Sequence, residues 1–74
     1  MIIQVIGPTH NPSSQKDQYE VFCNCNLIAI MEYSHNTHAF SLQFMEHFSF
    51  SCDEILGIMK AIANKIDDIR NSIE

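Results

Sequence analysis

The chain has little of several residue types that often mark a function. Its 74 residues include no tryptophan, two glycines, two prolines and three cysteines, and four Lys or Arg residues stand against nine Asp or Glu residues. Two separate glycines, Gly7 and Gly57, exclude a glycine-rich phosphate-binding loop. A formal net charge of -5 argues against direct binding to nucleic acid. No apolar run reaches the roughly 18 residues that a membrane-spanning helix needs, so we expect no membrane partner.

The cysteines and the first residues bear on the compartment. Cys23, Cys25 and Cys52 are an odd number, so a disulfide framework would leave one thiol unpaired. The segment from Met1 to Pro8 has no basic side chain and only a short apolar stretch, which is not the pattern of a secretory signal peptide. We therefore expect reduced thiols and a cytoplasmic location.

Length and composition predict one globular domain over residues 1–74. The hydrophobic share of 46% is too high for a disordered chain. A chain of this size buries only about 60% of the surface that its unfolded form exposes, so its core is marginal. Such a core needs a staple, a metal or a second subunit, and we expect a second copy of the chain and no cofactor.

Alternating apolar and polar residues predict three strands, at Ile2–Ile6, Tyr19–Tyr33 and Ala39–Phe50. The first is a short β-branched run that Gly7-Pro8 ends, and the polar residues from Thr9 to Gln18 are expected to form a long loop. In the second strand the odd-numbered residues are apolar and are expected to face the core. In the third strand the even-numbered residues take that place.

This change of parity predicts the register of the hairpin. Paired residue numbers must have an odd sum, and a sum of 73 or 71 gives a short four-residue loop. We prefer 73, which sets Met31 beside Leu42, Ala29 beside Phe44, Cys25 beside Phe48 and Cys23 beside Phe50. Glu46 is the one inward-facing position of the third strand that does not fit an apolar core.

A helix is predicted from Cys52 to about Ser72. Ser51 and Glu54 form a capping box at its start, and a heptad seam of apolar residues follows: Ile55, Met59, Ile62, Ile66, Ile69 and Ile73. The expected fold class is therefore α+β, a three-stranded antiparallel sheet (βββα) with one long C-terminal amphipathic helix packed on one face.

Two apolar surfaces remain unexplained by this fold and predict a homodimer. One is the narrow end of the helical seam, which either packs on a second copy, the reading we prefer, or lies along the end of the chain's own sheet. The other is a patch on the sheet face turned away from the helix. The sequence leaves open whether the sheet or the helix mediates the contact. The expected dimer interface consists of Phe22, Ile28, Ile30, Met45, Ile66, Ile69 and Ile73.

The chain offers no convincing catalytic or metal site. Cys23-x-Cys25 places two thiols on the core face of one expected strand, where they pack as core residues. His35-x-x-His38 would need a third metal ligand, such as His10 or His47, and nothing in the pattern brings these groups together. No Ser, His and acid set has the required local context. We expect a noncatalytic protein without a bound metal.

The order of elements resembles a double-stranded-RNA-binding domain that lacks its first helix. The resemblance fails on charge, because the helix begins with Cys52-Asp53-Glu54 where that family needs a basic cluster. Compact acidic chains with no catalytic motif are similar in kind to phage or mobile-element proteins that inhibit host machinery.

Two functions follow as expectations. The first is a protein-interaction module, an inhibitor or adaptor of phage or mobile-element type that occupies a basic surface on a host protein. The alternative is a small-molecule or nucleotide binder whose pocket forms between subunits, lined by the Thr9–Gln18 loop and the hairpin tip. The residues expected to bind the basic partner are Asp53, Glu54, Asp67, Asp68 and Glu74.

Overall fold

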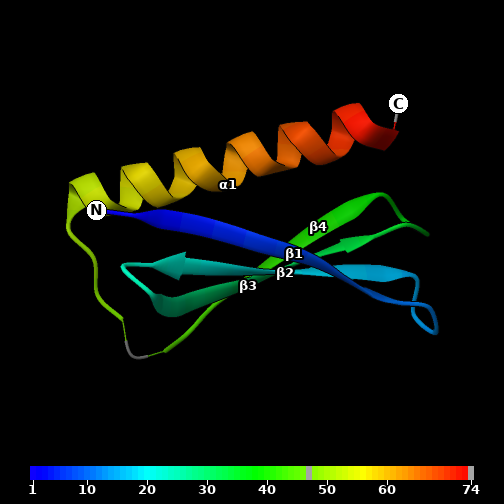
Figure 1. The fold of residues 1–74 in the computed structure, drawn as a ribbon, viewed down its shortest axis with the longest axis horizontal. Helices are drawn as coiled ribbons and strands as arrows, with labels where there is room; N and C mark the ends of the chain where they lie inside the picture. Colours follow the sequence, from blue (N-terminus) through cyan, green and yellow to red (C-terminus); the bar gives the residue numbers. More distant parts are fainter. Residues whose placement is uncertain (47, 74) are drawn as a thin grey trace.

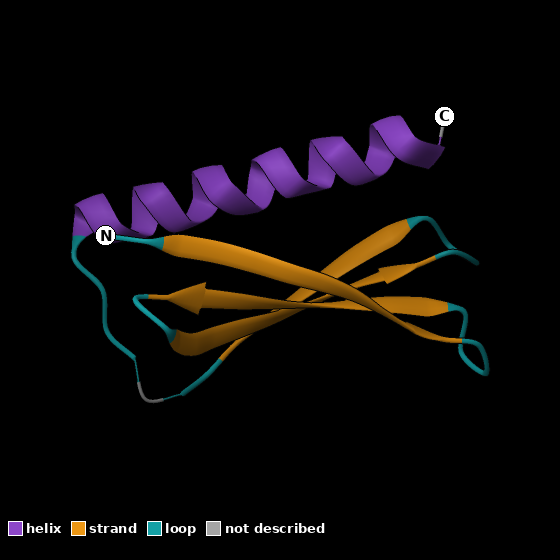
Figure 2. Cartoon of the chain, in the orientation of Figure 1, coloured by secondary structure: helices purple, strands orange, loops and turns teal. Residues whose placement is uncertain are grey.

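Four consecutive strands and one helix make up the chain in a computed structural model, which describes residues 1–46 and 48–73, the last by its backbone only. The strands pair as an antiparallel meander in the order β1-β2-β3-β4, and the helix lies along one face of the sheet (Figures 1 and 2). The α+β class, the antiparallel sheet and the C-terminal helix are thus confirmed. The elements are β1 (Ile3–Asn11), β2 (Lys16–Cys23), β3 (Asn26–Ser34), β4 (Ala39–Phe44) and α1 (Cys52–Ile73).

The sheet has four strands and not three because the segment Tyr19–Tyr33 folds back on itself. Cys23 pairs with Asn26, and the two residues between them, Asn24 and Cys25, have φ angles of 50° and 68°. Positive φ at both central positions defines the hairpin turn of type I′, which accepts Asn readily but seldom holds a Cys. The alternation of apolar and polar residues continues in the sequence across this turn, so the pattern gave no sign of it. Cys25 is consequently exposed in the turn and does not share the core face with Cys23.

The first strand is longer than expected, and a short turn takes the place of the long loop that was expected after it. β1 runs to Asn11 and β2 begins at Lys16, so the residues between them form a hairpin turn. The pairing steps from Ile6 with Glu20 to Thr9 with Gln18, which leaves one extra residue in β1 at Gly7-Pro8. This β-bulge reverses which residues of β1 face the helix.

The predicted register of the second hairpin is confirmed. Met31 pairs with Leu42 and Ala29 with Phe44, and residues 35–38 form the four-residue loop. The strand ends at Phe44, however, so its expected extension to Phe50 is wrong, and so are the expected pairs of Cys25 with Phe48 and of Cys23 with Phe50. Glu46 lies exposed in the connection to α1, which explains why it breaks the inward pattern.

A second bulge changes the position of Ile28. Val21 pairs with Ala29 and the next residue, Phe22, pairs with Leu27, so Ile28 is an extra residue in β3. At such a bulge two successive side chains turn to the same face. Ile28 and Ala29 are both buried, at 1% and 0% exposure, and the expectation that Ile28 points away from the helix is therefore wrong.

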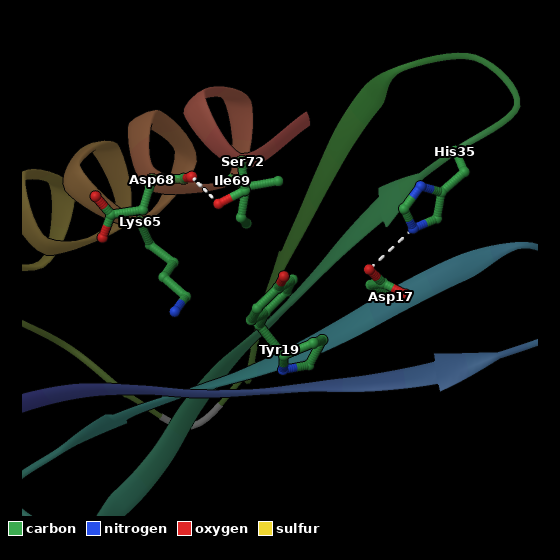
Figure 3. Close-up of a pocket in the computed structure, with 8 residues that line it drawn as sticks. Asp17, Tyr19, His35, Lys65, Asp68, Ile69 and Ser72 are labelled. Atoms are coloured by element: carbon green, nitrogen blue, oxygen red, sulfur yellow. Dashed lines mark hydrogen bonds and ion pairs between the residues drawn. The ribbon is translucent and has the colours of Figure 1, made fainter. Parts of the chain in front are cut away.

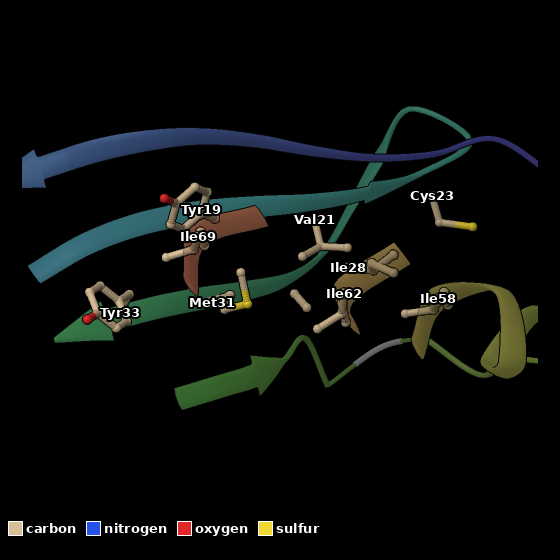
Figure 4. Packing of buried hydrophobic residues seen from close by; sticks show 10 residues of the cluster. Tyr19, Val21, Cys23, Ile28, Met31, Tyr33, Ile58, Ile62 and Ile69 are labelled. Atoms are coloured by element: carbon tan, nitrogen blue, oxygen red, sulfur yellow. The ribbon is translucent and has the colours of Figure 1, made fainter. Parts of the chain in front are cut away.

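The core lies between α1 and the face of the sheet that β2 and β3 present to it (Figure 4). Ile69 is only 8% exposed, because the last turns of α1 lie on the chain's own sheet. The expectation that this end of the seam is free for a second copy is wrong at Ile69, and the side chain of Ile73 lies outside the described residues. The buried residues are Tyr19, Val21, Cys23, Ile28, Ala29, Met31, Tyr33, Ile58, Ile62 and Ile69.

The start of α1 has the predicted capping box. The Ser51 N–H donates to Glu54 Oε1 (3.0 Å), and the Glu54 N–H donates to Ser51 Oγ (3.2 Å). The hydrogen bonds from Ser51 lower the pKa of the Glu54 carboxyl below its usual value, which keeps it ionised at the positive end of the helix dipole.

In the part of the chain that the structure describes, no helix has the length and hydropathy of a membrane-spanning segment.

The two glycines should respond differently to substitution. A Cβ at Gly7, where φ is 147°, would lie 2.8 Å from the Gln18 carbonyl oxygen and 2.9 Å from Tyr19 Cδ1. Gly7→Ala should therefore lower the free energy of unfolding by at least about 2 kcal/mol. Gly57 faces only the flexible end of Met1 within 3 Å, so the gain in helix propensity should hold the change for Gly57→Ala within about 1 kcal/mol. Urea denaturation measures the free energy of unfolding of both variants. Equal losses of stability in the two would contradict the backbone conformation of Gly7 in the bulge.

The turn between β2 and β3 makes a second prediction. Cys25→Gly should raise the free energy of unfolding by about 0.5 kcal/mol, because a left-handed backbone costs a non-glycine residue about 1–2 kcal/mol, more than the entropy lost by glycine. Cys25→Ala keeps the left-handed cost and is the matched control. A glycine variant less stable than the alanine variant would contradict the turn type.

Candidate functional site

A cluster of two histidines and one carboxylate lies where β1, β2 and the end of β3 meet. His10 Nδ1 is 2.5 Å from Asp17 Oδ1, and His35 Nε2 is 2.9 Å from Asp17 Oδ2. The Asp17 side chain is 15% exposed, whereas those of His10 and His35 are 47% and 39% exposed. The carboxylate is thus the anchored member of the cluster, and the two rings reach it from the solvent side.

The strand register brings these residues together. His10 and Asp17 are a cross-strand pair of β1 and β2, and the bulge at Gly7-Pro8 turns His10 onto the face that Asp17 shares with Tyr19. Asp17 also pairs with Tyr33 of β3, and His35 follows two residues later. The His35 N–H donates to the Gln15 carbonyl (2.9 Å), which holds the backbone of His35 beside the β1–β2 hairpin.

Electrostatics keep the Asp17 carboxylate ionised. Burial alone would raise its pKa, but the hydrogen bonds from His10 and His35, together with their charges when protonated, outweigh burial and lower the pKa below its usual value. An ionised carboxylate beside two imidazoles can accept two hydrogen bonds or share a cation with the rings.

Tyr33 lies between this cluster and His38, the other histidine of the hairpin tip. Its buried ring lies edge-on to the His35 ring, with centroids 4.9 Å apart, while its hydroxyl is 2.9 Å from His38 Nδ1. The two histidines of the predicted His35-x-x-His38 pair therefore have different partners. The other suggested ligand, His47, lies outside the described residues.

A cavity of about 360 Å³ opens beside the cluster, between the sheet and the last turns of α1 (Figure 3). The Lys65 ammonium lies 5.4 Å from the centroid of the Tyr19 ring, a cation–π contact at the cavity wall. Charged side chains of both signs line the cavity, Asp17 and Asp68 with negative charge and Lys65 with positive charge. Its lining residues are Pro8, Asp17, Tyr19, His35, Lys65, Asp68, Ile69 and Ser72.

A second candidate surface is apolar and lies at the other end of α1. Leu42 and Phe44 pair with buried residues of β3 and so face the helix side of the sheet, yet they are 38% and 42% exposed. In α1, Gly57 lies on the side of the helix that meets Ile3 of β1. Ile55 and Met59 lie on the opposite side of the helix and are 48% and 50% exposed. Phe48, in the connection to α1, is 40% exposed. We call Leu42, Phe44, Phe48, Ile55 and Met59 the β4 shelf.

The acidic residues predicted to bind a partner lie, where the structure describes them, in two pairs: Asp53 and Glu54 at the start of α1, and Asp67 and Asp68 toward its end. Glu54 belongs to the capping box and Asp68 lines the cavity. Asp53 and Asp67 are exposed, but Lys60 stands midway between them on the same line of the helix. Glu74 lies outside the described residues.

The residues predicted for the dimer interface are likewise divided. Ile28 and Ile69 are buried within the chain, and Ile66 packs partly against the core. Phe22, Ile30 and Met45 are half-buried. Of the two proposed surfaces, the helical stripe therefore covers the chain's own core at Ile66 and Ile69, and the sheet patch lacks its central isoleucine.

Sequence reasoning missed Asp17 because it lay inside the expected Thr9–Gln18 loop. A signal was present in Pro12, Ser13 and Ser14, which are common turn residues. Treating them as the turn of a hairpin would have placed Thr9–Asn11 opposite Lys16–Gln18 and His10 opposite Asp17.

Comparisons of the chain with protein-family models, with curated proteins and with solved structures gave no match. The cavity beside the His10, Asp17 and His35 cluster and the β4 shelf are therefore the features from which a function can be inferred.

Proposed function

We propose that the chain is a noncatalytic protein-interaction module that acts as a homodimer, an inhibitor or adaptor of the phage or mobile-element kind. The observation that carries the proposal is the exposure of Leu42 and Phe44, two apolar side chains of the β4 shelf on the helix side of an edge strand. Apolar residues gathered on one face commonly mark a protein contact.

The edge strand beside the shelf lacks the usual protection against pairing. β4 reads Ala39-Phe40-Ser41-Leu42-Gln43-Phe44, with no charged residue and no proline. β1, at the opposite edge, carries Pro8 and a bulge, and both discourage the addition of another strand. The sequence of β4 is thus suited to accept a further strand.

A second copy fits this edge by symmetry. Antiparallel pairing of β4 with its counterpart about a twofold axis perpendicular to the sheet joins the two sheets and keeps both helices on one face. The two shelves then meet beside the axis. Burying the exposed half of one such side chain contributes on the order of 1 kcal/mol, so the shelves of both copies together offer a gain comparable with the 4–15 kcal/mol cost of association.

The dimer contact is tested by placing a charge on the shelf. The native chain should have a mass near twice its 8.5 kDa in light scattering, and Phe44→Glu should give the single-chain mass with an unchanged circular dichroism spectrum. Ile6→Glu is the matched control, because Ile6 is 51% exposed and lies on the other face of the sheet. A native mass of 8.5 kDa at high micromolar concentration would refute the dimer.

The net charge of -5 supports a basic surface as the external partner. Reversing Asp67 and Asp68 to Lys should weaken binding of the protein that the immobilised chain captures. The loss should be smaller at high salt, where the Debye length falls to about 3 Å at 1 M. Lys60→Glu, on the same helix, should strengthen binding. Unchanged binding of the double variant at low salt would contradict the acidic contact.

The cavity favours a second candidate function, the binding of a small ligand. Its volume of about 360 Å³ lies at the small end of the range for ligand sites, and it forms within one chain instead of between subunits. A thermal-shift screen with nucleotides and small acids tests this candidate. A ligand-induced rise in Tm that Lys65→Met abolishes would support it.

A further inference from the structure

We propose that His10, Asp17 and His35 form a binding site for one divalent transition-metal ion, with Zn²⁺ as the ion of best fit. Each residue offers one ligand atom, and these atoms all lie within 4.8 Å of one another. The site is independent of the proposed protein contact, since none of its residues belongs to the β4 shelf.

The donor set selects the class of ion. Two imidazole nitrogens and one carboxylate oxygen suit Zn²⁺, Co²⁺, Ni²⁺ and Fe²⁺, whereas Mg²⁺ and Ca²⁺ prefer sets of oxygen ligands. Three protein ligands with a fourth position left for water are also the usual arrangement of an open zinc site. Because Asp17 and His35 line the cavity as well, that fourth position is available to a small ligand held there.

The distances require only small movements. Ligand atoms about 2.0 Å from a tetrahedral ion lie about 3.3 Å from one another, and the two histidine nitrogens are now 2.5 Å and 2.9 Å from the Asp17 oxygens. Rotation of the two exposed rings can open these two distances and shorten the widest separation among the three ligand atoms, which is at most 4.8 Å, while Asp17 stays in its anchored place. The rings already lie close together, with the centroids of His10 and His35 5.7 Å apart.

The proton balance of binding is defined by the same atoms. In the metal-free cluster, a neutral His10 carries a proton on Nδ1 and a neutral His35 carries one on Nε2 when they donate to Asp17. The ion takes the lone pairs of these nitrogens, so each ring moves its proton to the other ring nitrogen, and a ring that was protonated on both releases one proton.

The ion would also cross-link the fold. His10 belongs to β1, Asp17 to β2, and His35 follows β3, so a single ion ties the ends of three strands. A chain of this size gains more from such a link than a larger domain would, because its core is marginal. Metal binding should accordingly raise Tm as well as occupy the site.

Titration calorimetry of the metal-stripped full chain with Zn²⁺ tests the proposal. One ion per chain is expected, and Asp17→Asn, His10→Gln and His35→Gln should each weaken binding by at least about 100-fold, the upper range for changes outside the first ligand shell. His38→Asn is the matched control, since it removes a neighbouring imidazole that is bonded to Tyr33, and it should leave the affinity unchanged. Equal loss in His38→Asn would overturn the assignment.

The exposed thiols Cys25 and Cys52 require a separate readout. With Co²⁺, binding at the proposed site should produce visible d–d absorption without a thiolate charge-transfer band, and a Cys25→Ser, Cys52→Ser chain should bind as the native chain does. The ring nitrogens of His10 and His35, but not those of His38, should shift in nitrogen NMR spectra. Circular dichroism of each metal-free variant confirms folding. A thiolate band, loss of binding in the serine variant, or no binding by the folded native chain at millimolar Zn²⁺ would refute the proposal.

Discussion

A single helix has to cover a sheet that is wider than itself. An α-helix with its side chains is about 10–12 Å across, whereas four strands about 4.8 Å apart span a broader face. α1 packs on β1 and on the central strands, where Ile58, Ile62 and Ile69 meet the sheet, and it leaves Leu42 and Phe44 of β4 partly uncovered. The exposed Leu42 and Phe44 are therefore a consequence of the fold's proportions, and in the proposed dimer a second copy would supply the missing cover.

Two extra residues decide which side chains share the helix face. The bulge at Gly7-Pro8 turns His10 toward Asp17, and the bulge at Ile28 adds a large apolar side chain to the core. In a strand with a period of two, one inserted residue reverses every following position. The same device thus builds the polar cluster at one end of the sheet and fills the core near the other end.

The sequence predicted what depends on neighbouring residues. The capping box of Ser51 and Glu54, the length of α1 and the pairing of Met31 with Leu42 follow from local chemistry and from a continuous alternation. The sequence did not reveal the turn at Asn24 and Cys25, because a cysteine is an unusual residue for a left-handed backbone position. The cluster around Asp17 was equally hidden, since it depends on the contact of three strands.

The two candidate surfaces lie at opposite ends of α1. Ile55 and Met59 of the β4 shelf belong to the first turns, and Lys65, Asp68 and Ser72 at the cavity belong to the last. From Gly57 to Asp68 the helix rises roughly 16 Å at 1.5 Å per residue. Contacts at one end therefore do not occupy the other, and the proposed dimer through β4 would keep both of its His10, Asp17 and His35 clusters accessible. A partner that covers the last turns of α1 would instead compete with any ligand in the cavity, so the proposed functions exclude one another only at that end.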